Sequence, residues 1–270
     1  MSDDDAVEAL AERLRGASRV TVVTGAGVSA ASGIPTFRGP GGLWRRHRPE
    51  ELATAAAFAR DPKLVWEWYA WRRGLVASAK PNRAHEVLAE WSRRFPRFRL
   101  ITQNVDGLHE RAGTSDVIRF HGSLWEVSCW EDCGRTPARW RDERAFEDLP
   151  PRVSSSAPGP RHPRPGRRRG VLPPRCDACG GWLRPGVVWF GEPIDPEVLE
   201  ASREALDCDV CIAVGTSAVV YPAAGLVTTA GARGAFTAEV NPEATPASGA
   251  VDLAIAGPAE EVLGRVDRRL

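Results

Sequence analysis

The sequence predicts an α/β protein in which a parallel sheet is covered by helices on both faces, with a second, smaller domain. Short apolar segments rich in β-branched residues alternate with helical segments along most of the chain, which is the pattern of a wrapped parallel sheet. Residues 129–180 interrupt this alternation with two cysteine pairs. A chain of 270 residues, 43% of them hydrophobic, is long enough for a large domain with a smaller one inserted.

The strands of this sheet are predicted from short apolar runs that end in glycine or polar residues. We expect strands at 19–25, 98–104, 117–123, 209–217, 235–241 and 251–257. A further short apolar segment, VVWFGE, occupies 187–192. Helices are expected at 5–16 and 82–94, together with one that has Asp61 as its N-cap and Pro62 in its first turn and runs to about Ser78.

The composition excludes several classes of protein. A formal net charge of +1 gives no case for general binding to nucleic acid or to a membrane surface. No apolar run approaches the length of about 18 residues that a membrane-spanning helix needs. The N-terminus, MSDDDAVEAL, has the wrong charge for a secretory signal, so the six cysteines favour thiols or metal ligands over disulfides. We therefore expect a cytoplasmic protein.

One stretch, residues 150–174, is too rich in Pro, Arg and Ser to bury a core. It has two interpretations: a basic arm for an acidic partner, or a disordered surface insertion. The second is favoured, because such insertions are tolerated in surface loops.

A glycine-rich turn follows the first predicted strand. The segment from Gly25 to Ala30 matches G-x-G-x-x-A, in which glycines let the backbone approach a pyrophosphate. A simple tight turn of small residues is the alternative. The second strand ends in TQNVDGLH rather than in an acidic residue that would hold a ribose, which argues against ordinary hydride transfer.

Polar residues follow two other strands at the edge where open α/β sheets bind ligands. Gln103, Asn104 and Asp106 come just after the second strand. His121 ends another strand and can reach the same crevice, where an imidazole can accept a proton near neutral pH. A structural histidine is the alternative for His121.

The cysteines form three pairs, at 129 and 133, at 176 and 179, and at 208 and 211. Two pairs tens of residues apart suit a tetrahedral structural zinc site. Glycines follow Cys133 and Cys179 and free the tight turns of a chelating loop, whereas Cys208 and Cys211 begin a buried strand. We expect zinc ligands at Cys129, Cys133, Cys176 and Cys179, with Cys208 and Cys211 in the core.

Taken in order, these motifs resemble the sirtuins, which are NAD-dependent protein-lysine deacylases. The resemblance covers nearly the whole chain and rests on GAGVSAASGIPTFRG (25–39), QNVDGLH (103–109), HG (121–122), the cysteine pairs, VVWFGE (187–192), GTS (215–217) and EVN (239–241). It implies a Rossmann-like large domain at 1–42, 84–124 and 185–270. It further implies a small domain formed by a helical module at 43–83 and a zinc ribbon at 125–184, with NAD and an acyl-lysine peptide in the cleft between them.

The resemblance also implies roles for individual residues around NAD. The phosphates would lie at Gly25, Ala26 and Gly27. The adenosine side would contact Gly215, Thr216, Ser217, Asn241 and Ala259. The nicotinamide end would be covered by Thr36, Phe37 and Arg38, of which Thr36 stands where many deacetylases carry Asp. Gln103 and Asn104 would contact the ribose and an ordered water, and Asp106 the carboxamide.

For the reaction itself, the resemblance implies that the acyl oxygen attacks the ribose carbon that carries nicotinamide. His121 would then deprotonate a ribose hydroxyl, with Asn104 as a second catalytic residue, and the products are nicotinamide, free lysine and O-acyl-ADP-ribose. The backbone of Val188, Trp189, Phe190, Gly191 and Glu192 would bind the substrate as an added strand. The three residues between the cysteines of the first pair, where two are commoner, leave the zinc geometry less sharply defined.

Tyr69 and Arg72 lie three residues apart in VWEWYAWRRG (65–74) and share a helix face. Spacing alone favours simple packing among the neighbouring tryptophans. The sirtuins that remove succinyl, malonyl or glutaryl groups are similar in having this pair, which implies that a hydroxyl and a guanidinium hold a distal carboxylate. We therefore expect a desuccinylase and demalonylase that keeps some deacetylase activity.

Two other functions stay open at this point. An NAD glycohydrolase or protein ADP-ribosyltransferase would use the same pocket. A zinc-ribbon adaptor would use the basic 150–174 arm to bind nucleic acid. The intact QNVD and HG motifs make this function the less favoured one. The expected partners are acyl-lysine proteins or peptides, with no membrane, and we expect a monomer.

Overall fold

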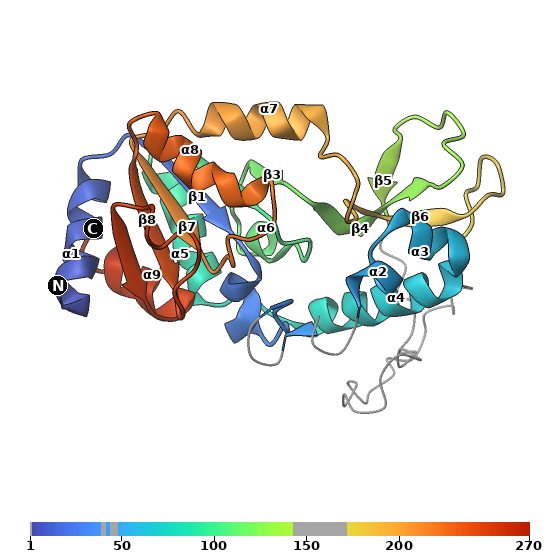
Figure 1. Cartoon of the computed structure of the whole chain (residues 1–270), viewed down its shortest axis with the longest axis horizontal. Helices are drawn as coiled ribbons and strands as arrows, with labels where there is room; N and C mark the ends of the chain where they lie inside the picture. Colours follow the sequence, from blue (N-terminus) through green and yellow to red (C-terminus); the bar gives the residue numbers. More distant parts are fainter. Residues whose placement is uncertain (1, 39–41, 44–47, 143–171) are drawn as a thin grey trace.

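The computed structural model describes residues 2–38, 42–43, 48–142 and 172–270 (Figure 1). Most of the predicted insert at 150–174 therefore lies outside the described residues. No helix in the described ranges combines the length and the apolar character that crossing a membrane requires.

The large sheet is parallel throughout, and its strands lie in the order β3-β2-β1-β7-β8-β9. These strands are β1 (Arg19–Thr24), β2 (Arg97–Thr102), β3 (Val117–Arg119), β7 (Val210–Val214), β8 (Phe236–Asn241) and β9 (Leu253–Ala256). The chain leaves β1 toward β2 in one half and returns to pair β7 on the other side of β1. This reversal opens a crevice at the carboxyl ends of β1 and β7, where such sheets bind ligands.

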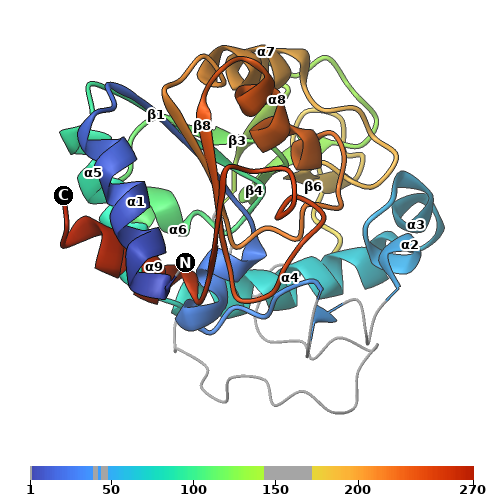
Figure 2. The same cartoon turned by 60° about the vertical axis from the view of Figure 1, so that its left-hand side comes forward.

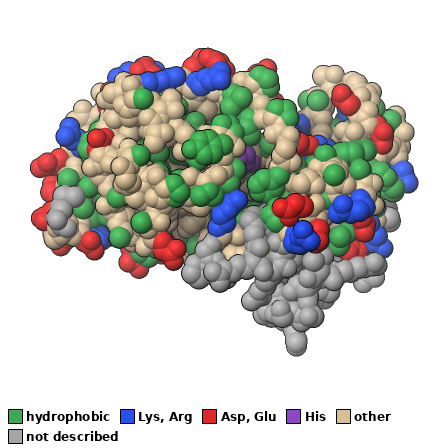
Figure 3. Space-filling model, in the orientation of Figure 1, with side chains coloured by type: hydrophobic (Ala, Val, Ile, Leu, Met, Phe, Trp, Pro, Cys, Tyr) green, Lys and Arg blue, Asp and Glu red, His purple; other side chains and the backbone are tan. Residues whose placement is uncertain are grey.

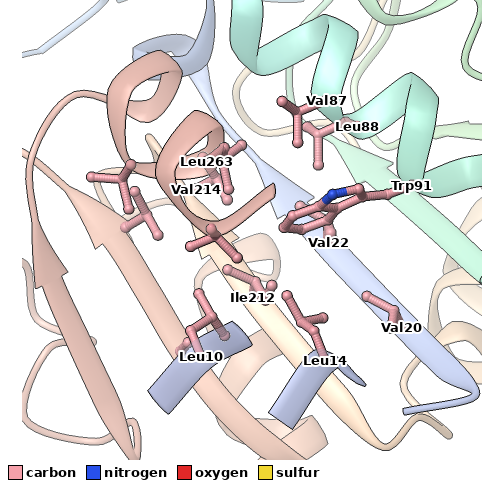
Figure 4. Packing of buried hydrophobic residues seen from close by; sticks show 14 of the residues in the cluster. Leu10, Leu14, Val20, Val22, Val87, Leu88, Trp91, Ile212, Val214 and Leu263 are labelled. Atoms are coloured by element: carbon pink, nitrogen blue, oxygen red, sulfur yellow. The ribbon is translucent and has the colours of Figure 1, made fainter. Parts of the chain in front are cut away.

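Helices cover both faces of the large sheet, as predicted (Figure 2). On one face lie α1 (Asp3–Arg15), α5 (Arg83–Arg94) and α9 (Ala259–Asp267); on the other lie α7 (Pro196–Ala205) and α8 (Leu226–Ala232). Figure 4 shows the first of these cores, in which Leu10, Trp91 and Leu263 from three helices meet Val22 and Ile212 of the sheet. Burial of these apolar side chains supplies the main stabilising free energy of this half.

The second part of the molecule combines a small antiparallel sheet with short helices. The sheet has the order β5-β4-β6, formed by β4 (Gly122–Cys129), β5 (Arg139–Arg141) and β6 (Leu183–Val187). The helices are α2 (Pro49–Leu52), α3 (Ala55–Arg60) and α4 (Pro62–Ser78). A third apolar core joins them to the sheet through residues such as Phe58, Trp66 and Leu183. The predicted start of α4 is confirmed, since the Asp61 side chain accepts a hydrogen bond from the Leu64 amide.

One strand prediction differs from the structure. The single strand predicted at 117–123 is divided, because the chain turns at Phe120–His121 between β3 and β4 and passes from the large sheet to the small one. Gly122 allows this turn: its φ is +78°, and a Cβ there would lie 2.3 Å from the Gly186 carbonyl oxygen. The short apolar segment 187–192 contributes only Val187 to a strand, and a turn lies at Phe190 and Gly191.

The remaining elements surround the crevice. The turn after β1 continues as a 3₁₀ helix, η1 (Ala26–Ser32), and α6 (Leu108–Arg111) follows β2. A second 3₁₀ helix, η3 (Ala223–Gly225), follows the loop after β7.

Candidate active site

A cavity of about 1090 Å³ lies between the carboxyl edge of the large sheet and the small sheet with its helices. Figure 3 shows this hollow between the two parts of the molecule, with a histidine visible inside it. All the residues predicted to bind NAD or substrate line the cavity, except Asp106. Asp106 lines a small adjoining space, about 30 Å³ in volume, that shares Phe37, Arg72 and Asn104 with the large cavity.

Three glycines build the floor of the cavity where β1 and β7 end. The Gly27 amide donates a hydrogen bond to the Gly215 carbonyl oxygen at 2.8 Å, and the Gly25 amide donates to Val214. A Cβ on Gly27 would lie 2.8 Å from the Gly215 Cα, and one on Gly25 would lie 2.8 Å from the Thr216 Cα. Any larger residue would force the two turns apart, so the glycines keep bare backbone at the cavity surface.

Polar side chains of the segment after β2 lock these turns together. Gln103 Nε2 donates to Thr216 Oγ1 at 2.8 Å, and Asn104 Nδ2 donates to the Gly25 carbonyl oxygen at 3.0 Å. Asn241 Nδ2 donates to the Thr216 carbonyl oxygen at 2.8 Å. The side chains predicted on the ribose and adenosine sides therefore share one hydrogen-bonded frame.

Ser29, which the sequence analysis did not single out, connects two of the predicted residues. Its hydroxyl donates to Asp106 Oδ2 at 2.9 Å and accepts from Asn104 Nδ2 at 3.2 Å. Burial raises the pKa of the Asp106 carboxyl, and hydrogen bonds from the Leu108 amide and from Ser29 oppose that rise. The only sequence signal for Ser29 is its place inside the glycine-rich turn.

The orientation of His121 follows from a single backbone contact. His121 Nδ1 lies 3.2 Å from the Gln103 carbonyl oxygen, which can only accept, so Nδ1 carries the proton. Nε2 then keeps its lone pair, and the side chain lines the cavity. Burial lowers the pKa of His121, against the opposing effect of the Gln103 hydrogen bond. The imidazole is therefore neutral at physiological pH and able to accept a proton at Nε2.

Two further histidines, also missed by the sequence analysis, lie buried behind the site. His109 Nε2 is 3.0 Å from Thr24 Oγ1, and the rings of His85 and His109 have centroids 4.8 Å apart. Burial lowers the pKa of each of them to about 3. Both are neutral packing residues of the site's support, since neither lines the cavity among the described residues.

Tyr69 and Arg72 reach the cavity from one face of α4, as predicted from their spacing. The Arg72 guanidinium lies 4.9 Å from the ring centroid of Phe37 and 4.8 Å from that of Trp68. It makes no ion pair with a carboxylate of any described residue. Burial lowers the pKa of Arg72, and the charge interaction with Tyr69 opposes this. Arg72 also has a side-chain hydrogen bond with Tyr69, so its guanidinium offers the remaining donors of its fork to whatever enters the cavity.

The backbone amides of 188–192 are largely occupied within the chain. Val188 N–H donates to the His121 carbonyl oxygen at 3.0 Å, and Phe190 N–H donates to the Ala53 carbonyl oxygen at 2.9 Å. Trp189 N–H donates to Glu192 Oε2, and Glu192 N–H to the Trp189 carbonyl oxygen. Of these five amides only that of Gly191 has no acceptor among the described residues, and the Trp189 carbonyl oxygen already accepts from Glu192. An added strand would therefore have the Gly191 N–H and the other carbonyl oxygens as partners.

The four cysteines predicted as zinc ligands come together at one end of the small sheet. All four Sγ atoms lie within 4.8 Å of one another, with Cys129 and Cys179 3.5 Å apart and Cys133 and Cys176 3.8 Å apart. A tetrahedral zinc ion with Zn–S bonds of about 2.3 Å separates its sulfurs by about 3.8 Å, so the cluster fits zinc. Cys208 and Cys211 are buried in the core beside α7 and α8, as expected.

The comparison with known proteins agrees with this geometry. A model of the Sir2 family matches residues 25–222. The chain belongs to the Sir2 family. It is 50% identical over 238 residues to an NAD-dependent protein deacylase of Aquifex aeolicus, covering 87% of both chains. It is also 42% identical over 266 residues to the mitochondrial NAD-dependent protein deacylase sirtuin-5 of Danio rerio, covering 94% of this chain and 84% of that one.

Solved structures of Sir2 proteins share the fold. The crystal structure of a Sir2 homologue with NAD matches with a TM-score of 0.80 at 45% identity and covers 97% of this chain and 92% of that one. The predicted family and fold class are thus confirmed. NAD is the family's cofactor, and the cavity of this Sir2 protein has the bare glycine backbone that a dinucleotide needs.

Proposed function

We propose that this chain is an NAD-dependent protein-lysine deacylase that removes succinyl and malonyl groups, and also acetyl groups, and releases nicotinamide and O-acyl-ADP-ribose. The observation that carries the proposal is one continuous cavity whose lining includes the glycine turns, His121 and the Tyr69–Arg72 pair. The names of the relatives described above support the deacylase activity. The preference for acidic acyl groups is supported by the pair alone.

Within this proposal, NAD supplies the glycosidic bond whose cleavage expels nicotinamide and leaves an electrophilic ribose carbon. The glycines at 25, 27 and 215 leave room for its phosphates, and Asn104 and Gln103 present amides toward the ribose. Asp106 faces the small adjoining space, where a carboxamide would find a carboxylate held by Ser29.

His121 acts as the general base. Its Nδ1–H is engaged with the Gln103 carbonyl oxygen, which leaves Nε2 to take the proton of a ribose hydroxyl. The hydroxyl oxygen can then attack the carbon of the bound acyl group. The four cysteines, at the far end of the small sheet, hold a structural zinc ion and take no part in these steps.

The acyl-lysine enters from the side of the small sheet, between 188–192 and α4. Its peptide contributes backbone hydrogen bonds to the carbonyl oxygens of 188–192 and to the Gly191 amide, which reads little side-chain sequence. A distal carboxylate would pair with Arg72 and accept from Tyr69, a charged hydrogen bond worth about 1.5–3 kcal/mol. A monomeric, cytoplasmic enzyme is part of the proposal and rests on the sequence alone.

The test measures nicotinamide release from NAD with matched acetyl-, succinyl- and malonyl-lysine peptides, for the wild type and for His121→Ala. We expect release that depends on the peptide, equal molar amounts of free lysine and O-acyl-ADP-ribose, and a large loss of product in His121→Ala. Nicotinamide formed without peptide, together with free ADP-ribose, would instead identify an NAD glycohydrolase. ADP-ribose attached to protein would identify a transferase, and no consumption of NAD would leave the zinc-ribbon adaptor.

A further inference from the structure

The Tyr69 hydroxyl is already engaged on one side. Its oxygen lies 3.0 Å from the indole Nε1 of Trp189, and both side chains are almost completely buried. An indole N–H only donates, so the phenol oxygen is the acceptor in this bond. Its own proton must therefore point elsewhere, and the structure gives it no acceptor among the described residues.

The Trp189 indole is itself fixed from two directions. The Arg184 guanidinium carbon lies 3.8 Å from the centroid of the Trp189 ring. Arg184 also donates to both carboxylate oxygens of Glu192, at 2.5 and 2.8 Å, and Glu192 Oε2 accepts the Trp189 backbone N–H at 2.8 Å. The centroid of the Phe58 ring lies 5.4 Å from that of the Trp189 ring. With its ring stacked and its backbone held, the indole has little freedom to turn its N–H away from Tyr69.

The cation beside Tyr69 has the same need for an acceptor. Arg72 lies 5.6 Å from the centroid of the Tyr69 ring and is unpaired with any carboxylate of the described residues. The Tyr69 proton and the Arg72 guanidinium thus face a single cavity. The Tyr69 oxygen is a side-chain partner of Arg72, and neither group has a carboxylate oxygen from the described residues. An anionic acyl end supplies two oxygens at once.

We propose that Trp189 is a positioning residue for acyl selection: by donating to the Tyr69 oxygen it directs the Tyr69 proton toward the distal carboxylate of the acyl group, while Arg184 and Glu192 hold its indole. This inference rests on the proposed function and deepens it. It assigns to the Trp189 side chain a role separate from that of its backbone. Hydrogen bonds in such a chain also polarise one another, which strengthens the final bond to the carboxylate.

The test compares kcat/KM for succinyl-lysine and acetyl-lysine peptides, at saturating NAD, in a double-mutant cycle of Trp189→Phe and Tyr69→Phe. Phe keeps an aromatic ring at 189 but removes the N–H. We expect Trp189→Phe to lower the succinyl-to-acetyl ratio about 2- to 10-fold, through the KM for succinyl-lysine. In the Tyr69→Phe background, adding Trp189→Phe should cause no further change in the succinyl-to-acetyl ratio.

The matched control is Trp66→Phe, which also removes a buried indole N–H from the same apolar core, where it donates to the Leu183 carbonyl oxygen. This variant should lose stability without a change in the ratio. If Trp189→Phe does not fold, Arg184→Lys, which removes the flat group stacked on the indole, should lower the ratio in the same direction by a smaller factor.

The outcomes separate the two proposals. A ratio that falls in Tyr69→Phe but stays constant in Trp189→Phe, or in Arg184→Lys where that variant replaces it, overturns the role of Trp189 and leaves the acyl preference standing. Independent, additive effects in the cycle overturn it as well. A ratio that none of these variants changes rejects the carboxylate assignment of Tyr69, and the role of Trp189 falls with it.

Discussion

His121 Nδ1 lies 3.2 Å from the carbonyl oxygen of Gln103, and this contact decides which ring nitrogen faces the cavity. Because burial also lowers the His121 pKa, the imidazole stays neutral at pH values below the usual pKa of histidine. A histidine with the ordinary pKa of about 6.5 would be half protonated at pH 6.5. We therefore expect kcat/KM at pH 6.5 to exceed half of its plateau value, and its fall on the acid side to be centred below pH 6.5. A pH profile of kcat/KM between pH 5 and 8.5 checks this, and a limb centred above pH 7 would contradict it.

The buried histidines at 85 and 109 should make the fold sensitive to acid. Their pKa values in the folded protein are about 3, against about 6.5 in the unfolded chain. Between those values the unfolded state binds more protons, so stability is present above pH 6.5 and falls as the pH drops. Each histidine removes up to about 1.4 kcal/mol per pH unit in this window. Urea unfolding at pH 7 and pH 5 measures the loss, and His109→Gln should reduce it. An equal loss in both proteins would be evidence against this cause.

Replacing one cysteine of the cluster should release the metal. Cys179→Ser weakens a site of four thiolates, and the small sheet should lose stability because zinc binding contributes folding free energy. Cys208→Ser is the matched control, since Cys208 lies in a different core. Metal analysis of the purified proteins should find about one zinc per chain in the wild type and the control, with much less in Cys179→Ser. The same zinc content in all three proteins would mean that the cysteine cluster is not the zinc site.

Gly27→Ala should damage NAD binding severely. The added Cβ would lie 2.8 Å from the Gly215 backbone and push the two turns apart. Gly249→Ala is the comparison variant, because its Cβ would meet nothing within 4 Å. Calorimetric titration with NAD should show an affinity at least about 10-fold weaker for Gly27→Ala, which corresponds to a cost of about 1.4 kcal/mol, and wild-type affinity for Gly249→Ala. Unaltered binding by Gly27→Ala would mean that the turns give way at little cost.

The pair on α4 should control the choice of acyl group. In a Tyr69→Phe, Arg72→Met variant, kcat/KM for succinyl-lysine should fall by about 10- to 150-fold, since a hydrogen bond to a charged group contributes about 1.5–3 kcal/mol. Acetyl-lysine offers no carboxylate and should lose far less. Parallel assays on both peptides measure the difference. Equal losses on the two substrates would indicate that the pair serves packing.

Much of the fold and of the site could be predicted because its signals are local. Asp61 and Pro62 mark the start of α4, and the glycine turn after β1 and the cysteine spacings need only neighbouring residues to be recognised. The division of the strand at 117–123 could not be predicted. Strand propensity does not register that Gly122 takes a positive φ and turns the chain into a second sheet.

Contacts between distant segments could also not be predicted from the sequence. The bond from Trp189 to Tyr69 joins residues 120 positions apart, and only the packing of α4 against the small sheet creates it. In the same way, the sequence of 188–192 suggested an edge for an added strand but did not show that most of its amides already have acceptors. The acceptors of two of them, the His121 and Ala53 carbonyl oxygens, come from distant parts of the chain.

The strand β4 begins immediately after His121 and ends at Cys129. A single strand therefore connects the proposed general base to the cysteine cluster, although the two are about 25 Å apart along an extended chain. The glycine turns proposed to hold the dinucleotide follow β1 and β7 of the other half. Depletion of zinc in a cell should thus leave the protein able to sequester NAD while its turnover is lost, so that supply of the metal and supply of the cofactor govern the enzyme through different halves.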